Sequence, residues 1–154
     1  MNKKTKAIML TSIILLLGFL REYLFANINW IFLTLTNGRK NAARNEFQFL
    51  MDWEISKIIV LKWILTFLFS FLFFLITYFI VKIYFQKKEF NHTVIYTFVG
   101  LFIISSILFT IGEIFGVYEI LYSIIRTIMG MVQSFMPLMI LFVLFKFLPP
   151  SKYN

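Results

Sequence analysis

Four long apolar segments occupy most of this 154-residue chain, and they constrain its fold more than any short motif does. One helix needs about 20 mainly apolar residues to cross a bilayer core about 30 Å thick. Segments of that kind lie at residues 7–26, 58–81, 93–111 and 120–148. Only 14% of the residues are charged, against about 25% in soluble domains. We therefore predict an all-α polytopic membrane protein, a single domain over residues 1–154 with four transmembrane helices in a bundle.

The first apolar segment has two interpretations. It follows Lys3, Lys4 and Lys6, and a basic start before an apolar core is typical of a cleaved signal peptide as well as of an uncleaved anchor. Cleavage after Ala26 would place the bulky Leu24 at a position that prefers a small side chain. We therefore expect an uncleaved helix.

The lysines and arginines of the connections predict the orientation of the chain. With the N-terminus in the cytoplasm, the inner side holds Lys3, Lys4, Lys6, Lys82, Lys87, Lys88, Lys146 and Lys152. The outer loop, predicted at residues 27–57, holds Arg39, Lys40, Arg44 and Lys57, and the connection after the third segment holds Glu113 and Glu119. The bias favours both termini in the cytoplasm. We expect a bacterial inner-membrane protein, and abundant Ile, Phe, Lys and Asn are consistent with a low-GC bacterium.

The outer loop is the one sizeable segment predicted outside the membrane. It contains a turn signal at residues 37–38 and an apolar and aromatic stretch after Asn45. This stretch predicts a short interfacial helix, capped by Asn45, whose aromatic side chains enter the headgroup region. The loop either rests on membrane lipids or forms a docking surface for a partner.

Several classes of function are disfavoured by the composition. The net charge of +8 is explained by membrane topology and attraction to anionic lipids, so we expect no nucleic-acid binding. The absence of cysteine and the single histidine, His92, leave no thiolate or paired-histidine metal site. We expect no catalytic residues, no metal and no cofactor.

Polar residues inside the apolar segments recur at helical spacing and so form stripes. The stripe of the fourth segment contains Glu119, Tyr122, Arg126, Gly130, Gln133 and Pro137. Weaker stripes contain Lys62, Thr66, Ser70 and Thr77 in the second segment, and Ser106, Thr110 and Glu113 in the third. Small and hydroxyl residues at this spacing favour helix packing, and Pro137 predicts a kink.

Arg126 is the most informative of these residues, because an arginine inside a span costs about 3 kcal/mol unless it finds a partner or reaches the interface. We expect it at the outer level of the membrane with Glu22, Glu113 and Glu119 as possible partners. It either fixes the helix register through an ion pair or belongs to a binding site. The candidate binding or partner-docking residues are Arg21, Glu22, Lys62, Glu113, Glu119, Tyr122, Arg126 and Gln133.

The layout resembles the small four-span membrane proteins associated with exosortases in Bacteroidota. The likeness rests on Arg21, Glu22, Leu24 and Phe25 and on the series Tyr122, Arg126, Gln133 and Pro137. After Phe25 the chain reads Ala-Asn-Ile-Asn where that family has a Tyr-Asp-Pro type turn, and its Gln133 and Pro137 are separated where the family tends to place them together. Because an exosortase needs a cysteine nucleophile, the resemblance implies an accessory role.

Two functions follow as hypotheses. In the first, the protein is a non-catalytic accessory subunit that docks on an exosortase-like sorting enzyme or a secretion system through its polar stripes and outer loop. In the second, the cluster of Arg21, Glu22, Lys62 and Arg126 binds or moves an anionic lipid-linked molecule. A third interpretation is a helix bundle whose charges serve folding alone.

Overall fold

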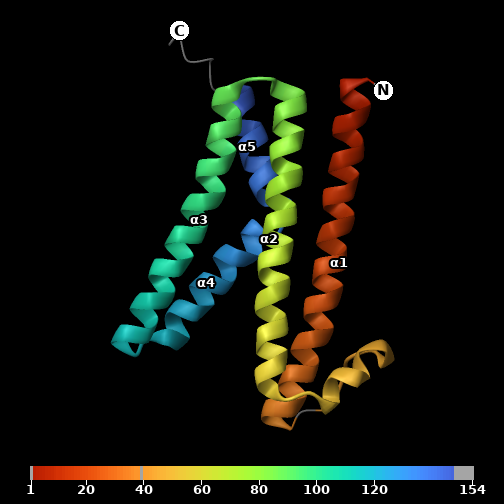
Figure 1. The fold of residues 1–154 in the computed structure, drawn as a ribbon, viewed down its shortest axis with the longest axis vertical. Coiled ribbons are helices and arrows are strands. Elements are labelled where there is room, and N and C mark those ends of the chain that lie inside the picture. The colour runs from red at the N-terminus through yellow and green to blue at the C-terminus, as the bar shows by residue number, and fades with distance from the viewer. Residues whose placement is uncertain (1, 39, 148–154) are drawn as a thin grey trace.

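Helices are the only regular elements in the computed structural model, which describes residues 2–38 and 40–147 (Figure 1). In chain order they are α1 (Lys3–Asn37), the 3₁₀ helix η1 (Asn45–Asp52), α2 (Ile55–Phe85), α3 (Lys88–Phe115), α4 (Tyr118–Val132) and α5 (Met136–Phe147). The side chains of Lys4, Tyr118 and Glu119 lie outside this description. The predicted all-α class is confirmed for the described residues.

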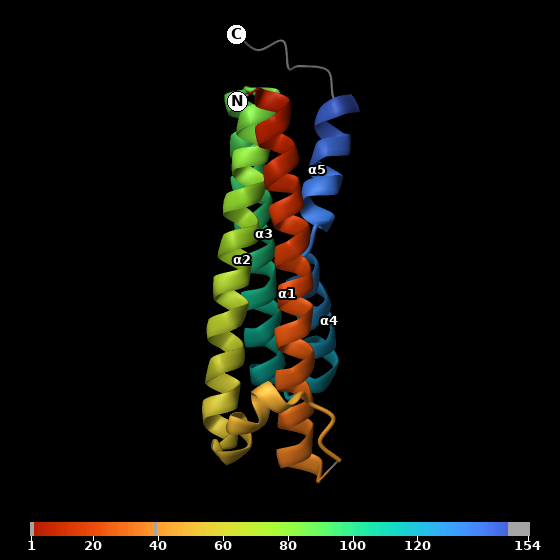
Figure 2. The same cartoon turned by 90° about the vertical axis from the view of Figure 1, so that its right-hand side faces the viewer.

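Three long helices run the length of the molecule, and α4 and α5 together form a fourth, bent pass (Figures 1 and 2). Helix α1 packs on α2, α2 on α3, and α3 on α4, so successive helices are neighbours. Among the described residues, α1 (residues 5–37), α2 and α3 are long and apolar enough to cross a membrane, and α4 with α5 makes a fourth span if the bent pair is counted as one. These helices make the chain a multi-pass helical membrane protein.

The first helix is longer than the sequence predicted. It continues through residues 27–37, which we had assigned to the outer loop, and ends at Gly38, whose φ of 63° is the left-handed conformation that glycine adopts without strain. Ile28 and Ile31 are buried one helical turn apart, which gives this extension an apolar face. At about 1.5 Å per residue, α1 is longer than the bilayer core is thick, so one of its ends extends beyond that core.

The short helix η1 lies beside the end of α1 (Figure 1). Its buried Leu50 packs with Ile28 and Ile31 of α1 and Ile58 of α2. The predicted cap was wrong, because Arg44 occupies the N-cap position and Asn45 is the first residue of the helix. The side-chain oxygen of Asn45 instead accepts a hydrogen bond from Gln48 Nε2 at 3.0 Å.

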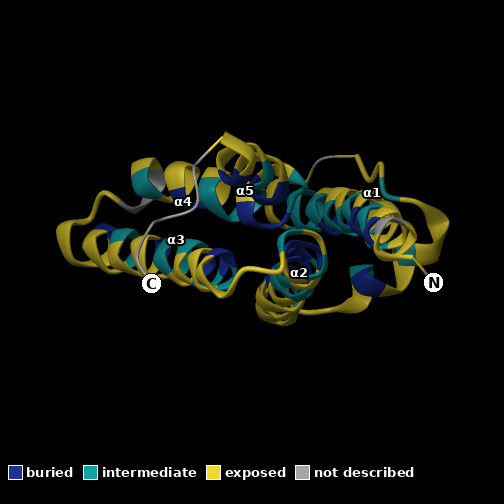
Figure 3. Cartoon of the chain, turned by 90° about the horizontal axis from the view of Figure 1, so that it is seen from above, coloured by how far each residue is buried: buried dark blue, intermediate teal, exposed yellow. Residues whose placement is uncertain are grey.

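The main core lies between α1, α2, α3 and the α4–α5 pass. Phe73 of α2 is fully buried and packs in one cluster with Ile14 of α1, Val94 of α3 and Val132 of α4. Buried residues line the surfaces where the helices meet, and exposed residues cover the outer faces (Figure 3). Many of the exposed residues are large and apolar, as helices that face lipid require.

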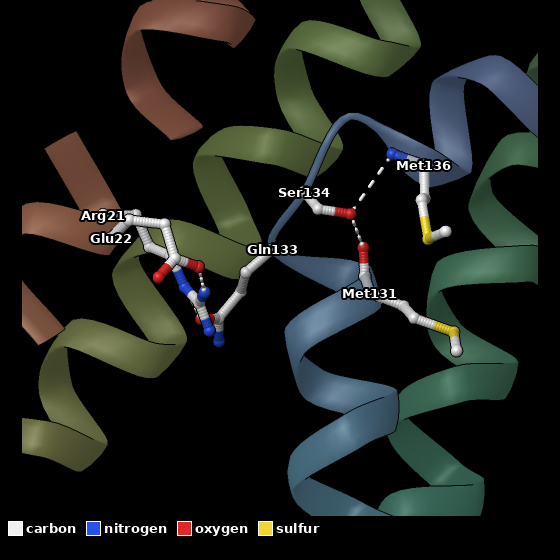
Figure 4. A network of polar contacts seen from close by, with 6 residues as sticks. All are labelled: Arg21, Glu22, Met131, Gln133, Ser134 and Met136. Atoms are coloured by element: carbon white, nitrogen blue, oxygen red, sulfur yellow. Dashed lines mark hydrogen bonds and ion pairs between the residues drawn. The ribbon is translucent and has the colours of Figure 1, made fainter. Parts of the chain in front are cut away.

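The fourth pass bends by 64° between α4 and α5, which confirms the kink predicted from Pro137. Proline has no backbone N–H, so the carbonyl of Gln133 cannot receive the usual helical hydrogen bond from this position. Ser134 occupies the break: its hydroxyl donates to the Met131 carbonyl at 2.7 Å and accepts from the Met136 N–H at 3.2 Å (Figure 4). The predicted segment 120–148 is therefore two helices in its described part.

Candidate functional site

A cavity of about 720 Å³ lies between α1, α2 and α4, and it brings together most of the predicted site residues. Six of the eight candidates line it: Arg21, Glu22, Lys62, Tyr122, Arg126 and Gln133. Glu113 is exposed on α3 and does not line the cavity. The side chain of Glu119 lies outside the described part of the structure.

Each helix contributes one face to the cavity, because residues three or four positions apart lie on the same side of a helix. Helix α1 contributes Arg21, Glu22, Phe25, Ala26, Asn29 and Phe32. Helix α2 contributes Ile59, Lys62, Trp63 and Thr66. The fourth pass contributes Tyr122, Ile125, Arg126, Met129 and Gly130 of α4 and the residue that follows this helix, Gln133. The polar stripes predicted for the second and fourth segments therefore face each other across this space.

Gln133, the last lining residue of the fourth pass, joins three helices through its side-chain amide. Its Oε1 accepts a hydrogen bond from Arg21 Nε at 3.2 Å. Its Nε2 donates to the Thr66 carbonyl and to Ser70 Oγ, both at 3.0 Å. Only 2% of Gln133 is exposed, so these bonds satisfy an amide that has left solvent.

The Arg21 guanidinium is held by neighbours on its own helix as well. Its Nη1 donates to the Glu22 carboxylate, and its Cζ lies 5.1 Å from the centre of the Phe25 ring. Figure 4 shows Arg21 and Glu22 directed from α1 toward Gln133. This arrangement fixes one edge of the guanidinium and leaves further N–H donors for a ligand.

Lys62 and Arg126 supply the other two positive charges of the cavity. The ammonium of Lys62 lies 4.7 Å from the centre of the Phe32 ring, and Arg126 lines the same cavity from α4. Among the described side chains, no carboxylate forms an ion pair with either residue. The pairing of Arg126 with Glu22 or Glu113 that we considered is therefore not formed, because Glu22 pairs with Arg21 and Glu113 is exposed on α3.

The described lining thus combines three cations with one carboxylate, a net charge of two positive, on walls that are mostly aliphatic and aromatic. Such a site favours an anionic group attached to an apolar body. The described residues contain no group of three or more His, Cys, Asp or Glu side chains that could hold a metal ion.

The sequence analysis does not predict the part of the cavity lining after residue 26. Asn29 and Phe32 continue the face of Arg21 and Phe25 at helical spacing, but the predicted first helix ends at residue 26. This spacing indicates that the helix continues. Asn27 and Asn29 favoured a loop instead, because polar residues after an apolar segment are typical of its end.

The other polar stripes differ in their role. Ser70 and Thr77 of α2 are buried, as a packing stripe requires. Ser106 and Thr110 of α3 are exposed, and their hydroxyls donate to the carbonyls of Phe102 and Ser106, each at 2.9 Å. The hydroxyls of the α3 stripe therefore bond within their own helix.

Comparison with known proteins does not assign this chain to a family. No protein-family model, curated protein or solved structure matches the chain.

Proposed function

We propose that this protein binds an anionic, lipid-linked molecule in the cavity between α1, α2 and α4. One observation carries the proposal: among the described residues, Lys62 and Arg126 line the same cavity with no carboxylate paired to either. Uncompensated charges within a membrane protein are costly and usually mark a functional site. A bound anion would offset that cost.

The walls of the cavity favour a ligand with an apolar part. Phe25, Phe32 and Trp63 surround the charged groups, and all three belong to helices apolar enough to cross a membrane. A small soluble anion would leave these surfaces without contact. An anionic headgroup with its attached chain would contact both the cations and the rings.

The location that we propose is the bacterial inner membrane, with both termini in the cytoplasm and the cavity toward the outer leaflet. Lysines at residues 3, 4, 6, 87 and 88 cluster at one end of the helices by sequence, as the positive-inside rule requires of a cytoplasmic side. The opposite end carries Glu46, Asp52 and Glu54 beside its basic residues. A cysteine-labelling experiment with a membrane-impermeant reagent, at position 41 and at position 87, tests this orientation.

Native mass spectrometry tests the binding function. The protein is extracted from its own membranes in a mild detergent, and we expect an anionic lipid to remain bound in near-stoichiometric amount. Arg126→Ala should lose this lipid while keeping the helical content and melting temperature of the wild type. Lys57→Ala is the matched control, because Lys57 is exposed at 62% of its side chain, pairs with Glu54 and does not line the cavity. Equal lipid retention by all three proteins would refute the proposed function.

A second candidate function is the accessory role, in which the protein docks on a larger membrane enzyme of the exosortase type. The observation that favours it is the stripe of Ser106, Thr110 and Glu113, which is exposed on α3. The test is a pull-down from native membranes in mild detergent. Recovery of a membrane enzyme in stoichiometric amount, lost on changing Ser106 and Thr110 to Leu, would support docking, and recovery of the protein with lipid alone would refute it.

A further inference from the structure

The charges of the cavity limit which anionic group it can hold, provided that the proposed binding function is correct. We infer that the bound group is a phosphate monoester, which carries about two negative charges, and not a phosphodiester, which carries one. The group can be the headgroup of a lipid or a free phosphate, since both present a terminal phosphate with about two negative charges.

The first step of the argument is the charge balance. Arg21, Lys62 and Arg126 contribute three positive charges, and Glu22 removes one. A phosphate monoester carries about 1.5 to 2 negative charges at neutral pH, so it nearly neutralises the described lining. A phosphodiester would leave one of the three cations without a counter-charge.

The second step is the placement of the cations. They come from three different helices, Arg21 from α1, Lys62 from α2 and Arg126 from α4. A terminal phosphate has three oxygens that accept charge-assisted hydrogen bonds, one for each of three donors around it. A phosphodiester has two such oxygens, because its other two are esterified, so it cannot serve three cations equally well.

The third step is the open edge of Arg21. Its Nε and Nη1 are directed at Gln133 and Glu22, while Nη2 faces Gly130 of α4, where an added Cβ would lie 4.0 Å away. The glycine therefore leaves this edge of the guanidinium uncovered by any side chain at position 130. Gln133 and Glu22 orient the guanidinium, and Nη2 remains as a donor directed toward α4.

The experiment compares ligands that differ in charge. The detergent-solubilised protein carries Trp30→Phe and Trp53→Phe, so that the cavity residue Trp63 alone reports binding by fluorescence. It is titrated with short-chain phosphatidic acid, short-chain phosphatidylglycerol and inorganic phosphate. We expect phosphatidic acid to bind at least about tenfold more tightly than phosphatidylglycerol, because one additional charge-assisted hydrogen bond is worth about 1.5 kcal/mol or more.

Charge variants give the inference a second, independent readout. Arg126→Gln should reduce the ratio between the two lipid affinities, whereas Lys57→Gln should leave it unchanged because Lys57 lies outside the cavity lining. Circular dichroism and thermal melting verify that each variant is folded. An unchanged ratio of the two lipid affinities in Arg126→Gln would contradict the inference that this cavity recognises the second negative charge of the ligand.

The outcomes separate the inference from the function on which it rests. Equal affinity for phosphatidic acid and phosphatidylglycerol would overturn the monoester inference and leave the proposed lipid binding intact. No binding of either lipid would overturn both. Preference for phosphatidic acid supports the inference. The ligand is then a lipid if inorganic phosphate binds more weakly, whereas equally tight binding of inorganic phosphate would retain the doubly charged group and overturn the lipid part of the proposed function.

Discussion

Replacement of Gln133 by leucine is the perturbation with the clearest expected magnitude. Leucine keeps most of the side-chain volume but removes the bonds to Arg21 Nε, the Thr66 carbonyl and Ser70 Oγ. Interhelical hydrogen bonds in a membrane protein contribute about 0.6 kcal/mol each on average, with a maximum near 1.7. Three such bonds give an expected loss of about 2 kcal/mol in the free energy of unfolding.

The assay is equilibrium unfolding in mixed detergent micelles, followed by circular dichroism. Ser70→Ala removes one of the three bonds at a cost of about 0.6 kcal/mol, and it also removes the bond that Ser70 Oγ donates to the Thr66 carbonyl. Because the first of these bonds is already absent from Gln133→Leu, the double variant should lose about 0.6 kcal/mol less than the sum of the two single losses. Gln48→Leu, at an exposed position in the middle of η1, is the matched control and should change stability by less than about 0.5 kcal/mol. A Gln133→Leu protein as stable as the wild type would refute the role of this amide as a link between three helices.

Three further predictions concern the fold, each measured by the same unfolding assay unless stated. Gly116→Ala should reduce the free energy of unfolding by about 1–2 kcal/mol, because Gly116 has a φ of 67°. Gly100→Ala is the control and should be neutral or stabilising, because Gly100 is in the interior of α3 with nothing within 4 Å of an added Cβ. Equal effects of the two changes would contradict this backbone argument. Phe73→Ala should cost about 3 kcal/mol because this fully buried ring lies in the main core, and a loss below about 1 kcal/mol would show that the core is not packed around it. Leu50→Ala should increase hydrogen exchange of residues 45–52 without changing that of α3, because Leu50 holds η1 on α1 and α2; unchanged exchange would mean that η1 is held by other contacts.

The helical class and the position of the long helices follow from composition and hydropathy, but the end of α1 does not. Two asparagines after Ala26 are typical of a loop in sequence. In the structure Asn27 is buried, and its amide is satisfied by the Tyr23 carbonyl at 2.7 Å and by the Arg44 N–H at 2.9 Å. The second partner lies in a distant segment, so the local sequence could not reveal that Asn27 belongs to a helix.

The candidate site was predictable to a similar degree. Helical spacing placed Lys62 with Thr66, and Tyr122 with Arg126 and Gln133, each set on one face. The spacing does not say which way a helix is rotated against its neighbours, so Glu113 was expected beside Arg126 although it is exposed on α3. Arg21 and Gln133 are 112 positions apart in the chain and meet only because the helices pack together. No local sequence pattern encodes such a contact.

Site-specific photocrosslinking tests the central claim, that the cavity selects an anionic lipid, most directly. A benzophenone amino acid is placed at position 59, which lines the cavity, or at position 60, which is exposed on α2 at nearly the same depth and does not line it. Both proteins are irradiated in nanodiscs of phosphatidylcholine with a minor fraction of phosphatidic acid, and the lipid adducts are identified by mass spectrometry. We expect adducts at position 59 to be enriched in phosphatidic acid and adducts at position 60 to follow the bulk lipid composition. The same lipid distribution at both positions would contradict the account.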